Sequence, residues 1–139
     1  MPLGRRSAAD EKPRVRRILV GTDLSPTAGR AVAWAADMAS RYEAELLLVR
    51  VVASDSPAAR DELVRYAAGV APGATALVAV GEDPADAIVE AVQRERADVV
   101  VVGSVGMRGR KTFLLGNVPN RVSHAAGCTV VIVDTADGA

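Results

Sequence analysis

The chain has 139 residues, 50% of them hydrophobic and 24% charged, which is the composition of one ordinary globular domain. Its formal net charge is zero, which excludes a general electrostatic attraction for nucleic acid. No apolar run reaches the ~18 residues that a membrane span needs, and no apolar stretch follows the first charged residues as in a signal peptide. Cys128 is the only cysteine, so an internal disulfide is impossible. We therefore expect a cytoplasmic protein, and the many Ala and Arg residues suggest a bacterial source.

The polar residues 1–13 end at Pro13, and we expect them to form a flexible extension before a single domain over residues 14–136. Arg and Lys exceed Asp and Glu over residues 1–17. This excess predicts a solvated basic tail, with docking to a partner as the alternative.

From residue 15 onward, apolar strand patterns alternate with helical patterns. Strands are predicted over residues 15–22, 46–52, 75–80, 98–103 and 128–134. Helices are predicted over residues 26–41, 57–69 and 84–96, and from about residues 116–118 to 127. Ser25-Pro26, Ser56-Pro57 and Asp83-Pro84 mark three of the starts, because the side-chain oxygen caps the helix and proline presets φ. This order predicts a doubly wound α/β fold, with a parallel sheet covered on both faces; periodicity alone leaves the strand order open.

Ligands of open parallel sheets bind at the carboxyl ends of the strands. Gly21-Thr22-Asp23 follows the first strand, and a long glycine-containing loop follows the fourth. In that loop Gly103 and Gly106 can bring the backbone close to an anion and adopt positive φ. The residues Gly116-Asn117-Val118 begin a helix, whose free N–H groups and dipole favour phosphate. Positive charge is added by Arg108, Arg110 and Lys111, for which solvated loop charges are the alternative interpretation.

The spacing of Gly103, Gly106 and Gly116 resembles the nucleotide-binding signature of the universal stress protein family, G-x2-G-x9-G-[ST]. The valine run before Gly103, the first strand with its Asp-containing turn, and the closing strand are also similar to the family. Asn117 departs from the pattern, since it stands where the family has Ser or Thr. The resemblance covers residues 15–135 and is to the ATP-binding branch.

The resemblance implies the strand order 3-2-1-4-5 and a site for ATP, or for ADP, AMP or cyclic AMP, with or without Mg²⁺. It places Asp23 near the ribose or base and Val51 against adenine. The complete implied site is Gly21, Thr22, Asp23, Val51, Gly103, Ser104, Gly106, Arg108, Gly116, Asn117 and Val118. No catalytic residue and no metal ligand are expected among them.

No Ser-His-Asp or Cys-His set is apparent, and no general base stands beside the phosphate loop, so we expect little or no turnover. The leading hypothesis is a nucleotide-dependent regulatory protein of the stress response. The alternatives are a cyclic AMP-binding protein, a nucleotide-free protein-interaction module and, last, a phosphotransfer enzyme. The uncharged apolar strand 129–133 predicts edge pairing, and the resemblance implies a homodimer through it.

Four residues have structural interpretations. His124 lacks a second ligand at metal-binding spacing and is expected on a helix surface or partly buried. Cys128 is expected to be a small core residue at the start of the last strand. Trp34 and Tyr42 are expected to pack against the protein around the first helix and not to stack on a base.

Overall fold

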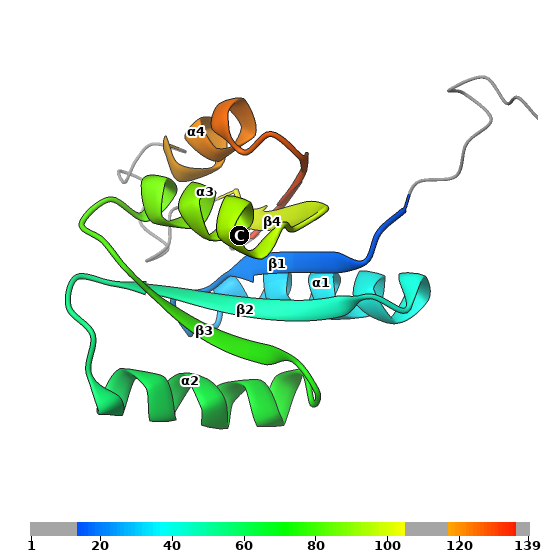
Figure 1. Cartoon of the computed structure of the whole chain (residues 1–139). Coiled ribbons are helices and arrows are strands. Elements are labelled where there is room, and N and C mark those ends of the chain that lie inside the picture. The colour runs from blue at the N-terminus through cyan, green and yellow to red at the C-terminus, as the bar shows by residue number, and fades with distance from the viewer. Residues whose placement is uncertain (1–13, 105–116, 136–139) are drawn as a thin grey trace, which may run out of the picture.

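The structure, a computed structural model, describes residues 14–104 and 117–135 (Figure 1). In chain order the elements are β1 (Arg17–Gly21), α1 (Ala28–Tyr42), β2 (Glu45–Val52), α2 (Pro57–Val70), β3 (Thr75–Val80), α3 (Pro84–Glu95), β4 (Val99–Gly103), α4 (Asn117–Ala125) and β5 (Thr129–Val133). This alternation confirms the predicted α/β fold. The predicted extension 1–13 and residue 136 of the predicted domain lie outside the described residues.

The strands form one parallel sheet in the order β3-β2-β1-β4-β5, which is the order that the resemblance implied. The chain winds outward from β1 to β3, then returns to the other side of β1 for β4 and β5. The carboxyl ends of β1 and β4 are therefore neighbours at the point where the winding direction reverses. In doubly wound folds this reversal opens a crevice for a ligand.

Alternate strand residues enter two separate apolar cores, because successive side chains of a strand point to opposite faces. On one face Leu19 and Val100 pack with α3 and α4, whereas on the other Ile18 and Val101 pack with α1 and α2. Figure 1 shows α3 and α4 on the opposite side of the sheet from α2. The valine run of β4 is buried on both faces, as a central parallel strand requires.

Two of the three predicted helix caps coincide with the observed starts. The Ser56 side chain accepts a hydrogen bond from the Ala59 N–H, and the Asp83 side chain accepts one from Ala85 N–H. The predicted start of α1 was early, since Ser25, Pro26 and Thr27 form a turn before the helix begins at Ala28. Ser25 Oγ nevertheless accepts from the Ala28 N–H at 3.2 Å, so Ser25 still satisfies a helix-start donor. The predicted strand 75–80 coincides with β3, and the other observed boundaries differ from prediction by at most two residues.

The structure bears on all four individual interpretations. Trp34 and Tyr42 remain 36% and 43% exposed, so the expectation that they pack against the protein is only partly met. Cys128 is half-buried and lies one residue before β5, not within it. His124 is exposed on α4, as expected.

Candidate functional site

The turn after β1 is held by short-range hydrogen bonds between side chains and backbone. Thr22 is fully buried, and its N–H donates to the Val49 carbonyl of β2 at 2.9 Å. Thr22 Oγ1 accepts from the Leu24 N–H at 3.0 Å, and Asp23 Oδ1 accepts from the Ser25 N–H at 2.9 Å. Leu24 adopts a φ of 69°, which these bonds stabilise in a region that side chains disfavour. The structure therefore uses the Thr22 side chain inside the turn, while Asp23 stays partly exposed.

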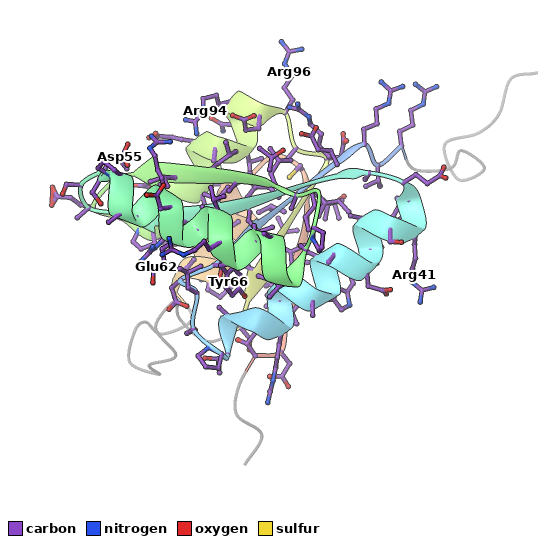
Figure 2. All side chains as sticks on the ribbon, turned by 90° about the horizontal axis from the view of Figure 1, so that it is seen from below. Arg41, Asp55, Glu62, Tyr66, Arg94 and Arg96 are labelled. Carbon is purple, nitrogen blue, oxygen red and sulfur yellow. The ribbon has the colours of Figure 1, made fainter. Side chains whose placement is uncertain are left out.

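Tyr66 of α2 lies beside this turn and was not predicted from the sequence. It projects from α2 (Figure 2), and its hydroxyl interacts with Thr22. Burial raises the pKa of Tyr66, and the nearby Asp23 charge acts in the same direction, so the phenol stays neutral. The signal was the spacing of Leu63, Tyr66 and Ala67, which puts all three on the inner face of α2.

The carboxyl end of β4 is joined to the end of β5 through Ser104. Its N–H donates to the Val133 carbonyl at 2.7 Å, and its Oγ accepts from the Thr135 N–H at 3.1 Å. Ser104 Oγ also lies 3.5 Å from Asp134 Oδ1. These contacts connect Ser104 to β5 and the residues after it, so the N–H and hydroxyl of this predicted site residue already have protein partners.

Gly103 serves packing, and not the positive φ that we expected of it. The described glycines with positive φ are Gly73 and Gly127. A Cβ at position 103 would lie 2.7 Å from Thr135 Oγ1 and 2.9 Å from Thr135 Cγ2. Thr135 is itself buried, with 2% of its surface exposed. The absence of a side chain at Gly103 thus allows Thr135 to pack against the Gly103 backbone.

Helix α4 begins at Asn117 and is anchored by Val118 and Val122 against the core shared with α3. Its first turn therefore lies at the carboxyl-end side of the sheet, with free N–H groups as in any helix start. Gly106, Arg108, Gly116 and the predicted loop cations Arg110 and Lys111 lie outside the described residues, as does the Asn117 side chain.

Arg121 of α4 makes ion pairs with Asp83 and Asp86 at the start of α3, with Nη2 2.7 Å from Asp86 Oδ1. Hydrogen bonding to Arg121 is the main cause that lowers the pKa of Asp83, and the same contact raises the pKa of Arg121. These residues link the two helices on one face of the sheet.

The predicted adenine contact, Val51, lies near the carboxyl end of β2, opposite Ala79 of β3. It is half-buried and packs against the core on the α3 and α4 face. The structure thus places Gly21, Thr22, Asp23, Gly103 and Ser104 at the adjoining ends of β1 and β4, with Val51 one strand further out.

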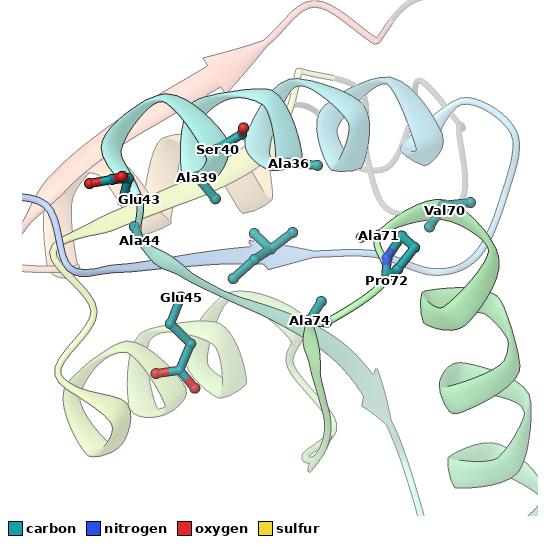
Figure 3. Close-up of a pocket in the computed structure, with 12 residues that line it drawn as sticks. Ala36, Ala39, Ser40, Glu43, Ala44, Glu45, Val70, Ala71, Pro72 and Ala74 are labelled. Carbon is teal, nitrogen blue, oxygen red and sulfur yellow. The ribbon is translucent and has the colours of Figure 1, made fainter.

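A cavity of about 420 Å³ lies at the opposite end of the sheet, between the end of α1 and the turn that leads into β3 (Figure 3). Its lining is mostly apolar, with Ser40, Glu43 and Glu45 as polar members. Because it is formed at the amino ends of the strands, it is separate from the candidate site. Within residues 14–104 and 117–135, no three potential His, Cys, Asp or Glu ligands are grouped to hold a metal ion. None of the helices in these ranges has both the length and the apolar character of a bilayer span.

The Universal stress protein family matches the chain in two overlapping segments, residues 14–74 and 62–134. This chain belongs to the Universal stress protein family. The match extends over all of the elements that build the site, so the expected family is confirmed.

A universal stress protein of Methanocaldococcus jannaschii is 42% identical over 50 residues, which cover 36% of this chain and 29% of that relative. Another, from Mycobacterium tuberculosis, is 46% identical over 52 residues, which cover 37% of this chain and 36% of the relative. In these two alignments the chain thus spans only about a third of the length of the universal stress proteins that it matches.

Solved universal stress protein structures match over most of this chain. A universal stress protein in complex with cAMP is 33% identical, with a TM-score of 0.71, over 88% of this chain and 99% of that one. A universal stress protein from Archaeoglobus fulgidus in complex with dAMP has a TM-score of 0.65 at 22% identity, over 87% of this chain and 99% of that one. The second likeness shows the common fold.

Proposed function

We propose that this universal stress protein binds an adenine nucleotide, with ATP as the preferred ligand, where β1 and β4 end side by side. The observation that carries the proposal is the reversal of winding at these two strand ends, in a chain similar to a universal stress protein in complex with cAMP. Asp23 is partly exposed at this edge and would face the ribose or base, with Val51 toward adenine. Thr22 and Gly103 would shape the site through the backbone, because their side-chain space is filled by protein.

The phosphates would extend toward Gly106, Arg108 and Gly116 and the first turn of α4. The spacing of Gly103, Gly106 and Gly116 and the start of α4 at Asn117 support this direction. Mg²⁺ would be bound through the phosphates, since a metal of this kind is usually held partly by phosphate oxygens.

Isothermal titration calorimetry with ATP, ADP, AMP and cyclic AMP tests this proposal. A Gly116→Val variant should lose ATP binding, because a branched side chain would block the approach of phosphate to the helix start. Gly69→Val is the matched control, since a Cβ at Gly69 on α2 has no heavy atom within 4 Å. Retention of full ATP affinity by Gly116→Val would place the phosphates elsewhere, and failure of the wild type to bind any of the four would overturn the proposal.

A cyclic AMP-binding protein is the second candidate, because the solved structure with a TM-score of 0.71 is a cAMP complex. Asn117, in place of a hydroxyl residue, would favour a ligand without a γ-phosphate. Competition between ATP and cyclic AMP in the same titration separates the two: tighter binding of cyclic AMP would replace ATP as the assigned ligand.

We further propose a regulatory module of the bacterial cytoplasm with little or no turnover, which would respond to stress by presenting a nucleotide-dependent surface to a protein partner. Steady-state ATP hydrolysis should stay well below the ~1 per second of ordinary enzymes. Turnover at or above that rate would assign an enzyme instead. A chain that binds no nucleotide yet captures a partner would be an interaction module alone.

The same proposal includes a homodimer through β5. This strand lies at the edge of the sheet, carries no charged residue and leaves Ile132 48% exposed. An apolar edge of this kind pairs with another strand unless it is covered. Light scattering at micromolar concentration should give a dimer mass for the wild type and a monomer mass for Ile132→Lys. Val64→Lys, at a 56% exposed position on α2, is the control that should stay dimeric.

A further inference from the structure

Arg121 connects the start of α4 to the start of α3 through two carboxylates. Its Nη1 bonds to Asp83 Oδ2, and its Nη2 lies 2.7 Å from Asp86 Oδ1. A guanidinium with two separate carboxylate partners is held in a fixed orientation, because each N–H direction is set by its planar geometry.

Asp83 is fixed from both sides. Its Oδ1 accepts a hydrogen bond from the Ala85 N–H at 3.1 Å as the cap of α3, while its Oδ2 accepts one from Arg121 Nη1. Hydrogen bonding to Arg121 lowers the pKa of Asp83, so this carboxylate is charged at neutral pH. Asp86, in the first turn of α3, adds a second negative charge.

Arg121, which joins the two carboxylates, lies one turn after the start of α4. Arg121 lies four residues after Asn117, the first residue of α4, which is about 6 Å along a helix axis. This backbone separation is shorter than the ~8 Å Debye length at physiological ionic strength, so salt only partly screens the charge of Arg121 from a ligand at the helix start. Glu90 also faces the groove between α3 and α4, together with Asp86 and Arg121. Arg121 is the basic residue that lines this groove in the described part of the chain.

Phosphates at the start of α4 would therefore meet the field of several carboxylates. Arg121 cancels one of these charges and holds both Asp83 and Asp86 toward itself. Without it, the carboxylates would repel a phosphate chain and oppose the favourable helix dipole.

We propose that Arg121 is a positioning residue that offsets the carboxylates of Asp83 and Asp86, and so makes the first turn of α4 able to accept a polyphosphate. This inference rests on the proposed nucleotide site. The effect of Arg121 depends on the charge of the ligand: the affinity for ATP depends on Arg121, whereas the affinity for uncharged adenosine does not.

The test is calorimetric titration of the Arg121→Gln variant with ATP, ADP, AMP and adenosine. We expect the dissociation constant to rise about threefold to tenfold for ATP, less for each phosphate removed, and less than about twofold for adenosine. Arg41→Gln is the matched control, because it breaks the ion pair of Arg41 with Asp37 on α1 (Figure 2), where the side chains are 72% and 64% exposed. It should bind every ligand like the wild type.

A second variant separates charge from structural damage. The triple variant Asp83→Asn/Asp86→Asn/Arg121→Gln removes the carboxylates with the arginine, and Asn keeps the helix-capping oxygen at position 83. It should recover most of the ATP affinity that Arg121→Gln loses. Failure of this recovery, or an equal loss for ATP and adenosine, would overturn the inference.

The two proposals fail in different ways. If the wild type binds none of these ligands, the nucleotide site is wrong and the role of Arg121 is overturned with it. If the wild type binds ATP and Arg121→Gln binds it equally well, the site stands and the inference about Arg121 alone is wrong. If Arg121→Gln does not fold, Arg121→Lys replaces it. Its loss of ATP affinity should be smaller, because the positive charge is kept, and its ATP affinity should equal that of the triple variant. A triple variant that binds ATP clearly more weakly than Arg121→Lys would contradict the inference.

Discussion

Thr135 occupies the space that a side chain at Gly103 would fill, with its Oγ1 2.7 Å from where the Cβ would lie. The two residues lie close together because β4 and β5 are paired in register, with Gly103 opposite Val133. Gly103 was predicted as a phosphate-binding glycine, and its contact with Thr135 gives it a packing role that is independent of any ligand.

Gly103→Ala should destabilise the protein by about 1–3 kcal/mol, because added methyl groups in a packed interior force their neighbours to shift. Urea unfolding monitored by circular dichroism measures this change. In a Thr135→Ala background the same substitution should cost less than half as much, since the two nearest atoms, Thr135 Oγ1 and Cγ2, are removed and the Cβ lies at 3.3 Å. An equal cost in both backgrounds would show that another contact requires glycine.

Leu63→Ala should cost about 2–5 kcal/mol of unfolding free energy, because it leaves a cavity where a fully buried side chain joins α2 to the core. Val64→Ala, at the adjacent position with 56% exposure, is the control and should change stability by less than about 0.5 kcal/mol. Thermal unfolding of the three proteins gives the comparison. Similar losses for both variants would mean that α2 does not pack through the inner face that carries Leu63.

Acid stability should depend on Asp83. Because Arg121 lowers its folded-state pKa below the value of ~3.9 in unfolded chains, the contribution of Asp83 is complete above that value. It is lost as the pH falls through the lower, folded-state pKa. Asp83→Asn should therefore be less stable than the wild type at pH 7, and the difference should shrink below about pH 4.

Urea titrations at pH 7, 5, 4 and 3 follow this difference. Asp37→Asn is the control, since it removes an exposed partner of Arg41 and should differ from the wild type by less than about 1 kcal/mol at neutral pH. A gap between Asp83→Asn and the wild type that stays constant down to pH 3 would contradict the assigned ion pair.

Tyr66→Phe removes the hydroxyl that interacts with Thr22 and should cost about 0.5–1.5 kcal/mol, the net value of a typical intramolecular hydrogen bond. Thr22→Val tests the other partner, and the double variant should cost clearly less than the sum of the two single variants. Tyr42→Phe, at a 43% exposed site, is the control with little expected change. Additive single costs would show that the two hydroxyl groups do not interact.

Local sequence signals predicted most of the fold. The Ser-Pro and Asp-Pro pairs marked the starts of α2 and α3 correctly, because a cap and its first N–H donors lie within three residues. The start of α1 was less predictable, since Ser25-Pro26-Thr27 can form either a first helical turn or the observed turn before the helix. The order of the strands came from family resemblance, since periodicity does not specify which strands pair.

Contacts between distant positions were beyond local patterns. Gly103 and Thr135 lie on different strands, and Arg121 meets Asp83 across 38 positions of the chain. Nothing near Arg121 in the sequence distinguishes it from an ordinary solvated arginine. The predicted residues Gly21, Thr22 and Asp23 do lie at one turn, but only the structure shows that Thr22 faces inward.

If two copies paired through β5, one edge of each sheet would be covered and the other would stay exposed. Pairing would merge the two sheets into one and remove both β5 edges, so that β3 would form each outer border. Val80, at the end of β3, is 53% exposed and would then be among the apolar side chains left at that border. Growth beyond a dimer through strand pairing would require β3, and a charged residue at position 80 should limit such growth without disturbing the dimer.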